Sequence, residues 1–216
     1  MSEKIMIDKK YIVNLLKGAG WDIDLLCEFY PDCEFQFKEL QNDDDLEISN
    51  EGIDKVSMRY LAKKCNVSRQ APYIYFANKD SMLKECASYV SNEFSSYLEK
   101  SIEDFDNKNP KILTIMGRAY IKFFQNNPSY FDFIFNNNLY EIKLTIKEVE
   151  DNFKPFEVFR RVCVNLIKEA NIPEDVGFRS LVRCWSLVHG AASIVSSHNV
   201  TLDGDWDDAL SDLFKF

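Results

Sequence analysis

The sequence predicts an all-α fold, and three observations lead to this prediction. The 216 residues include only 7 glycines and 6 prolines, which lie between the apolar segments rather than inside them. From Val56 onward, apolar residues recur at intervals of three and four, the spacing of one helix face. Several of these segments also begin directly after Ser or Asn, residues that favour the N-cap position. Together these features indicate a chain of amphipathic helices.

The first 51 residues contain one expected helix and one acidic segment. The helix is expected over residues 8–17, and Gly18 and Gly20 end it. The acidic segment, residues 21–51, alternates polar and apolar side chains on both sides of the turn-like residues 42–45. This pattern fits a small hairpin, and it fits a flexible insertion equally well.

Three helix starts then follow within about 22 residues, after Ser57, Ser68 and Asn78. The apolar residues of the first helix stand at positions i, i+3, i+4 and i+7, namely Met58, Leu61, Ala62 and Cys65. The second helix, with Ser68 as its expected N-cap, extends to Phe76. Two short helices joined by a tight turn and supported by a third form a helix-turn-helix. We therefore expect a helix-turn-helix at about residues 57–76.

The rest of the chain is expected to form a larger helical body. Its predicted helices cover residues 111–127, 129–135, 155–170, 174–197 and 206–214. The boundary between the two domains falls inside the long helix that begins after Asn78. This gives an N-terminal domain of residues 1–85 and a C-terminal domain of residues 86–216.

The charge of the chain is distributed unevenly. The net charge of −9 at pH 7 argues at first against a nucleic-acid partner, because phosphate binding depends mainly on Lys and Arg. Residues 20–53 alone carry a net charge of −10, whereas residues 54–85, which include the predicted helix-turn-helix, carry +4. The helix-turn-helix is therefore a basic region that the total charge conceals.

Several classes of protein are not expected from this composition. No run reaches the roughly 20 apolar residues that a membrane-spanning helix needs, and the first residues lack the apolar core of a signal peptide. We therefore expect a soluble protein of the cytoplasm with no membrane partner. The six cysteines form no CxxC pair and fall mostly in helical segments, which argues against structural zinc or disulfides and for buried thiols.

No catalytic or cofactor site is expected either. The two histidines, His189 and His198, have no Cys or Asp placed with them in a nucleophile pattern, and the sequence has no Gly-rich phosphate loop. The acidic run from Asp43 to Asp45 lacks the glycine and the terminal glutamate of a calcium loop, which indicates a solvated turn. We expect neither an enzyme nor a bound metal or cofactor.

Two parts of the sequence resemble one known family. Residues 52–83 contain, in order and with the expected spacing, a capped helix, a Val-Ser turn, an aromatic-rich second helix and an Asn-Lys-Asp helix start. They resemble the DNA-binding segment of the TetR/AcrR family of bacterial transcriptional regulators. Residues 117–128 and 185–190 look like the C-terminal domain of the branch marked by a Trp…His-Gly motif. The resemblance covers about residues 52–216 and implies an all-α, homodimeric, ligand-responsive repressor.

Three residues at the start of the second helix are the candidates for reading DNA sequence. In a helix-turn-helix this end of the second helix meets the base edges, and Arg69, Gln70 and Ala71 occupy it. Arg and Gln suit bidentate hydrogen bonds with guanine and adenine, respectively. We expect Arg69 and Gln70 to specify the sequence of a double-stranded DNA operator.

Five further residues are candidates for phosphate contacts. The hydroxyls of Ser57, Ser68, Tyr73 and Tyr75 can donate hydrogen bonds to phosphates, which sets the register of the protein on DNA. Lys79 stands at a helix N-terminus, where a cation is unfavourable unless it shares a phosphate with the nearby amides. The other interpretation, that Lys79 is simply solvated, stays open at this point.

An aromatic group in the C-terminal domain is the candidate effector site. Trp185 and His189 are four residues apart on one helical face, and the resemblance places them near Tyr120 and Phe124. With Phe156 they would line a pocket for a small hydrophobic effector, and His189 would supply one orienting hydrogen bond. An effector there would shift the balance between two conformations of the domain. The alternative is that these residues are packed core aromatics and a satisfied histidine.

A homodimer is expected on geometric grounds as well. One short helix-turn-helix contacts too few base pairs for specificity, so such proteins bind two half-sites about one helical turn of DNA apart. Residues 174–197 and 206–214 would form a four-helix interface with the second copy.

The sequence departs from the family pattern before residue 52. Residues 42–50 are too polar to form the usual buried first helix, and residues 11–16 lie more than 30 residues too early. Residues 21–51 are therefore interpreted as an insertion, whose negative charge would weaken phosphate attraction within a Debye length of about 10 Å. Two functions remain: a DNA-binding regulator with an accessory or autoinhibitory insertion, or a non-DNA-binding interaction or ligand-sensing protein whose insertion contacts a protein partner.

Overall fold

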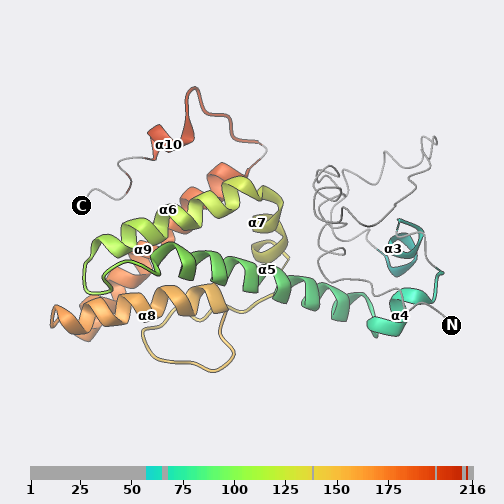
Figure 1. The fold of residues 1–216 in the computed structure, drawn as a ribbon, viewed down its shortest axis with the longest axis horizontal. Coiled ribbons are helices and arrows are strands. Elements are labelled where there is room, and N and C mark those ends of the chain that lie inside the picture. The colour runs from blue at the N-terminus through green and yellow to red at the C-terminus, as the bar shows by residue number, and fades with distance from the viewer. Residues whose placement is uncertain (1–56, 65–67, 138, 198, 211–212, 214–216) are drawn as a thin grey trace. The chain divides into compact units, whose positions relative to one another are not determined.

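The computed structural model describes residues 57–64, 68–137, 139–197, 199–210 and 213. All regular structure in these residues is α-helical, with no β-strand among them, so the all-α prediction is confirmed. In chain order the helices are α3 (Met58–Lys64), α4 (Ala71–Tyr75), α5 (Lys79–Ile102), α6 (Lys111–Asn126), α7 (Pro128–Phe135), α8 (Lys154–Glu169), α9 (Glu174–Ser196) and α10 (Trp206–Ala209) (Figure 1). None of the described helices is both long and apolar enough to cross a membrane. The helix expected over residues 8–17 and the acidic segment 21–51 lie outside the described residues.

The chain forms two compact units, residues 1–89 and residues 90–216. The division falls inside α5, a few residues after the boundary expected from the sequence. In the first unit α3 packs against α4. In the part of this unit that the structure describes, the buried side chains come from α3, from α4 with its C-cap, and from the first turns of α5: Met58, Ala62, Pro72, Phe76, Met82, Leu83, Cys86 and Ala87.

The start of α5 is fixed by a reciprocal pair of side-chain caps. The Ser81 amide donates a hydrogen bond to Asn78 Oδ1 at 2.8 Å, and the Asn78 amide donates one to Ser81 Oγ at 3.1 Å. These bonds give partners to backbone N–H groups that have none inside the helix. The predicted cap at Asn78 is therefore confirmed, and Lys79 is the first residue of α5.

The start of α4 differs from the prediction. The expected N-cap at Ser68 is wrong, because α4 begins at Ala71 and its N-cap is Gln70, which makes no side-chain capping bond. The Ser68 carbonyl instead accepts a hydrogen bond from the Ala71 amide at 3.0 Å, which closes a turn before the helix. Pro72 accounts for the later start, because its missing N–H is harmless only in the first turn of a helix. Arg69 and Gln70 therefore precede the helix instead of lying on its first turn.

The second unit is a helical bundle in which α9 packs against α6, α7 and α8 (Figure 1). Fully buried large side chains come from each of these helices, from α5 and from the residue before α8: Phe94, Leu98, Ile112, Phe124, Phe133, Ile134, Phe153, Phe156 and Leu181. The helices α6 to α9 begin and end within one residue of the predicted positions. The last helix, α10, ends at Ala209, earlier than the predicted residue 214.

Gly177 permits a close approach of α8 and α9. A Cβ atom built on Gly177 would lie 2.8 Å from Ile167 Cδ1 and 3.0 Å from Ile167 Cγ1 and Cγ2. Real Cβ contacts are longer, so the isoleucine side chain would have to move if another residue replaced the glycine. The small residue therefore lets Ile167 of α8 pack directly on the α9 backbone.

The connection between α7 and α8 has no helix or strand in its described residues, and one asparagine pins it. The Asn152 side chain accepts a hydrogen bond from the Lys143 amide at 3.0 Å and donates one to the Lys143 carbonyl, also at 3.0 Å. It also donates to Glu157 Oε1 of α8 at 2.9 Å. Since Glu157 pairs with Arg160 at 2.6 Å, and Arg160 donates to the Ile146 carbonyl, the loop is attached to α8 at several points.

Candidate functional sites

The residues predicted to contact DNA lie directly before and within the second helix of the helix-turn-helix. Ser57 immediately precedes α3 and is exposed. Ser68, Arg69 and Gln70 are exposed in the turn before α4, and Ala71 is half-buried at the first position of α4. The side chains that suit base reading are thus accessible to solvent, although they precede α4, because the helix starts two residues later than a cap at Ser68 would place it.

The helix α4 has a buried side and an exposed side. Pro72 and the C-cap residue Phe76 are buried, whereas Tyr73, Ile74 and Tyr75 are 56%, 77% and 40% exposed. Ile74 is the most exposed large hydrophobic side chain in the described part of the chain, and it was not among the predicted site residues. A helix of five residues is too short for its apolar spacing to show which side faces the core, so the sequence carried no clear signal for Ile74.

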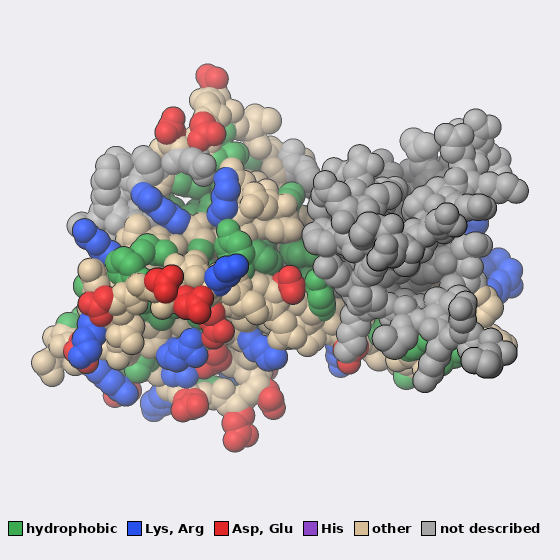
Figure 2. All heavy atoms as spheres, viewed as in Figure 1, with side chains coloured by type: hydrophobic (Ala, Val, Ile, Leu, Met, Phe, Trp, Pro, Cys, Tyr) green, Lys and Arg blue, Asp and Glu red, His purple; other side chains and the backbone are tan. Residues whose placement is uncertain are grey.

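The charged side chains around the helix-turn-helix are mainly basic. Those described as exposed in the first unit include Arg59, Lys63, Arg69 and Lys84. Lys79 is half-buried at the first position of α5, beside the N-terminal amides of that helix. On the second unit both signs are mixed, and Figure 2 shows Lys and Arg interspersed with Asp and Glu on the visible face. Attraction for phosphate is therefore expected at the first unit.

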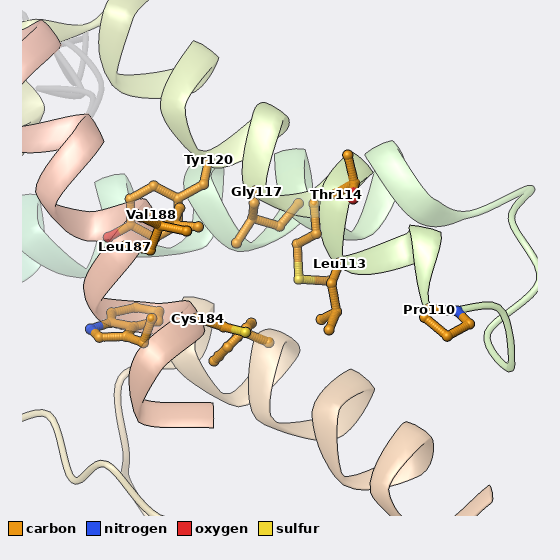
Figure 3. A pocket seen from close by; sticks show the side chains of 12 residues that line it. Pro110, Leu113, Thr114, Gly117, Tyr120, Cys184, Leu187 and Val188 are labelled. Carbon is orange, nitrogen blue, oxygen red and sulfur yellow. The ribbon is translucent and has the colours of Figure 1, made fainter. Parts of the chain in front are cut away.

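A cavity of about 170 Å³ lies inside the second unit. Its walls come from α5, α6, α8 and α9: Leu98, Pro110, Leu113, Thr114, Met116, Gly117, Tyr120, Phe159, Cys184, Trp185, Leu187 and Val188. Figure 3 shows side chains from α6 and α9 converging on it. The lining residues are mainly apolar, and those that carry a polar group are Thr114, Tyr120, Cys184 and Trp185. Such a lining suits a hydrophobic molecule with one polar group.

The five predicted effector residues belong to one aromatic cluster beside this cavity. The Tyr120 ring lies 5.5 Å from Trp185 and 5.3 Å from Phe124, and Trp185 lies 5.1 Å from Phe156 and 5.9 Å from His189, centroid to centroid. Tyr120 and Trp185 line the cavity, whereas Phe124, Phe156 and His189 do not. Phe124 and Phe156 are fully buried in the core instead.

His189 has its polar partner within the protein. Its Nδ1 lies 3.0 Å from the Tyr120 hydroxyl, and its ring packs against Phe131 at 5.0 Å and Phe135 at 4.5 Å. Burial lowers the pKa of His189 and raises the pKa of Tyr120, so both side chains are held neutral. In the neutral tautomer whose Nδ1 carries no hydrogen, His189 accepts a hydrogen bond from the Tyr120 hydroxyl. This bond holds the hydroxyl of Tyr120, a residue of the cavity wall, against His189, which is not part of that wall.

A second and larger cavity of about 440 Å³ adjoins the first. Pro110, Leu113 and Cys184 line both cavities. Lys108 and Glu169 line the second one and form an ion pair at 3.2 Å, with both side chains largely exposed. Of the residues that line the two cavities, only Tyr120 and Trp185 were expected from the sequence. The available signal was the repeat of small or polar residues on α6 at Thr114, Gly117 and Tyr120, three positions apart.

The cysteines of this region behave as apolar side chains. Burial raises the pKa of the Cys163 thiol, and the nearby Cys184 raises it further. Burial also raises the pKa of Cys184. Cys86 and Cys163 are buried and Cys184 is half-buried, whereas the other three cysteines lie outside the described residues. Neutral thiols are poor nucleophiles, so Cys184 contributes shape and polarisability to the two cavities.

Two stretches of the chain match known families. Residues 47–86 match the family described as bacterial regulatory proteins, tetR family, and residues 113–215 match the tetracyclin repressor-like C-terminal domain. A relative from Haemophilus influenzae, described as an uncharacterized HTH-type transcriptional regulator, is 34% identical over 135 residues, which cover 61% of this chain and 69% of the relative. The chain belongs to the TetR family. No solved structure gave a significant match.

The two TetR-family matches assign a role to the first unit. The match over residues 47–86 covers α3, α4 and the start of α5, so the predicted helix-turn-helix is the DNA-binding domain of a transcriptional regulator rather than part of an enzyme. This match begins inside residues 21–51, the segment interpreted as an insertion. The second match contains Trp185, His189 and Gly190, the residues of the Trp…His-Gly motif.

In this TetR-family regulator, α9 presents an exposed row of small and charged side chains. They recur at intervals of three and four residues: Arg179, Arg183, Ser186, Gly190 and Ser193. A Cβ atom built on Gly190 would meet no other atom within 4 Å. The fold of a single chain therefore does not require glycine at this position, in contrast to Gly177 on the same helix.

Proposed function

We propose that this regulator is a repressor that binds double-stranded operator DNA as a homodimer and releases it when a small hydrophobic effector enters the second unit. The observation that carries the proposal is the exposed group Ser68, Arg69 and Gln70 immediately before α4. From this end of the second helix a helix-turn-helix reaches the base edges. The basic side chains of the first unit supply the attraction for phosphate.

The DNA contacts divide into two kinds. Arg69 and Gln70 read bases, and the small Ala71 lets α4 enter the groove closely. The hydrogen bonds to phosphate come from Ser57, Ser68, Tyr73, Tyr75 and Lys79. For Lys79, its place at the first position of α5 favours a phosphate shared with the helix amides over a simply solvated side chain.

The homodimer supports this mode of binding. Two copies present two helix-turn-helices to half-sites about one helical turn of DNA apart. The interface is formed by α9 together with α10 and the residues that follow it. The exposed row on α9 supports this placement, because Gly190 leaves room for a helix of the second copy to approach closely.

The effector is a small hydrophobic molecule, about the size of one ring. The cavity of about 170 Å³ is comparable to an apolar cavity of about 150 Å³ that binds benzene. Tyr120 and Trp185 contact the effector directly. The orienting hydrogen bond comes from Tyr120, and His189 holds its hydroxyl in place, while Phe124 and Phe156 support the walls.

The acidic segment 21–51 is an accessory element in this proposal. Its charge of −10 opposes the phosphate attraction of the helix-turn-helix, so it reduces operator affinity. The alternative function is a non-DNA-binding interaction or ligand-sensing protein on the same scaffold, in which this segment contacts a protein partner. Both functions predict a stable helical protein, and they differ in whether the partner is operator DNA or a protein.

The test is binding to DNA from the region upstream of its own gene, measured by fluorescence anisotropy at several salt concentrations. We expect Arg69→Ala and Gln70→Ala each to weaken binding by about 1–3 kcal/mol and to relax the preference at one base position. Arg161→Ala is the matched control, because it removes an exposed charge from α8 in the second unit. Its operator affinity should stay at the level of the unmodified protein.

A shortened chain without residues 22–51 separates the two functions. If only the shortened chain binds specifically, the acidic segment is autoinhibitory. If neither chain binds specifically at low salt, the DNA-binding proposal is wrong and a protein partner of the acidic segment is favoured. The effector part of the proposal is tested separately, by the loss of operator binding on addition of single-ring compounds.

A further inference from the structure

Ile74 is an aliphatic residue whose side chain lies outside the core of the first unit. It is 77% exposed, while Pro72 and Phe76 on either side of it are buried. The other side of α4, with Pro72 and Phe76, is therefore the side that packs into the core of the first unit. A single exposed apolar residue is ordinary on a protein surface, so exposure alone carries no conclusion. Ile74 is notable because of its position relative to Gln70, the residue proposed to read a base.

Gln70 and Ile74 lie on the same face of the helix, about one turn apart. Gln70 has φ −88° and ψ −20°, which is right-handed helical geometry, so the helical spacing of α4 extends back to this residue. Residues four apart are then neighbours on one face, separated by about one turn of 5.4 Å. A surface that contacts Gln70 side-on also contacts Ile74.

The major groove of DNA contains one kind of apolar group, the 5-methyl of thymine. Glutamine suits the N6 and N7 edge of adenine, and every adenine is paired with a thymine whose methyl group faces the same groove. Adjacent base pairs are about 3.4 Å apart, so one helical turn covers the pair read by Gln70 and its neighbour. An aliphatic group one turn from Gln70 therefore meets a thymine methyl if such a pair is present.

We propose that Ile74 is a sequence-reading residue that packs on a thymine 5-methyl group in each operator half-site. This inference rests on the proposed binding of operator DNA and adds a base preference to it. The contact excludes water from the methyl group and from the isoleucine side chain. Cytosine lacks this methyl group, so Ile74 favours A·T pairs at its position.

The test replaces thymine by deoxyuridine, which keeps all hydrogen-bonding groups and removes only the methyl. The operator is first selected from random double-stranded DNA by the full chain, and each thymine is then replaced symmetrically in both half-sites. At one position we expect about fourfold weaker binding per half-site and about fifteenfold for the dimer, the loss for one buried methyl group at each. The Ile74→Ala variant should bind the thymine operator at least as weakly.

The decisive result is the combination of the two changes. If Ile74 contacts the methyl group, Ile74→Ala loses less than about twofold on that deoxyuridine substitution, because the contact is already absent. Leu144→Ala is the matched control, since Leu144 is an exposed aliphatic residue in the second unit. This control should retain the full sensitivity to deoxyuridine. Because Ile74 is exposed, its replacement leaves the fold intact.

Three other outcomes overturn the inference, and they can be distinguished. If the protein selects an operator but the variant and the unmodified protein respond equally to every deoxyuridine, Ile74 does not read thymine and DNA binding stands. If no sequence is selected and Arg69→Ala binds DNA like the unmodified protein, the proposed function fails and the inference fails with it. If Ile74→Ala changes the sedimentation of the protein without DNA, Ile74 belongs to a protein interface.

Discussion

The Tyr120 hydroxyl and His189 Nδ1 lie 3.0 Å apart and join α6 to α9 across 69 residues of sequence. Tyr120 also lines the cavity of about 170 Å³, whereas His189 does not. The hydrogen bond therefore connects the wall of the cavity with the aromatic core behind it. A molecule that displaced the Tyr120 hydroxyl would have to stretch or replace this hydrogen bond between α6 and α9.

The buried state of His189 predicts a dependence of stability on pH. Burial lowers the pKa of His189 below its ordinary value of 6.5, so the unfolded chain binds the proton at a higher pH than the folded one. The free energy of unfolding should be highest above pH 6.5 and should fall as the pH decreases through 6.5. Urea unfolding at about pH 7.5 and about pH 5.5 measures this change.

His189→Gln is the comparison for that experiment. Glutamine does not titrate, so the variant should lose less stability between the two pH values than the unmodified protein. Carboxylates contribute equally in both proteins and cancel in the difference. An identical loss in the two proteins would show that His189 is not responsible.

Filling the cavity should abolish ligand binding without unfolding the protein. Leu113 is half-buried in the wall of the cavity, and Leu113→Trp places a larger side chain into the empty volume. Phenol, a single ring with one hydroxyl, is a suitable probe. We expect phenol to raise the melting temperature of the unmodified protein and to have no such effect on Leu113→Trp. Leu144→Trp adds the same volume outside the cavity and should retain the full response.

Gly190 should matter for assembly rather than for folding. A side chain at this position meets nothing within 4 Å in a single chain, so Gly190→Leu should keep its helical content. At a close helix–helix interface the same change inserts excess volume, which costs about 1–3 kcal/mol. Sedimentation equilibrium should then show a dimer dissociation constant that is higher by about tenfold or more. An unchanged dimer would place the interface elsewhere.

Gly177 should show the opposite behaviour. The Cβ of Gly177→Ala would lie 2.8 Å from Ile167 Cδ1, so the isoleucine must shift. Crowding of about 1–3 kcal/mol exceeds the gain of about 1 kcal/mol in helix propensity. We expect a net loss of about 1 kcal/mol in the free energy of unfolding. Ile167→Val in the same background relieves the crowding at Cδ1 and should recover part of the loss.

Local signals in the sequence were sufficient for much of the fold. The helix start at Asn78 and the limits of α6 to α9 follow from caps, prolines and apolar spacing, which act within a few residues. The start of α4 was misjudged because Pro72 overrides the capping preference of Ser68. The loop between α7 and α8 could not be foreseen, because Asn152 bonds to Lys143 nine residues earlier and no periodic pattern records such a pair.

The sites were predictable in composition but only partly in geometry. The expected proximity of Tyr120 to Trp185 and His189 is confirmed, since it depends on packing that a family resemblance conveys. The cavity itself could not be derived, because its existence depends on how side chains from four helices fail to fill the space between them. The exposure of Ile74 likewise depends on which side of a five-residue helix faces the core.

The two cavities share Pro110, Leu113 and Cys184, and in the proposed effector site this shared wall would make affinity depend on the size of the ligand. A single ring would occupy the cavity of about 170 Å³. A longer molecule would have to displace the Leu113 and Cys184 side chains before it reached the second cavity of about 440 Å³, which Lys108 and Glu169 also line. Along a homologous series of alkyl-substituted rings, affinity should therefore rise at first and stay constant at intermediate chain lengths. It should rise again once the alkyl chain is long enough to enter the second cavity.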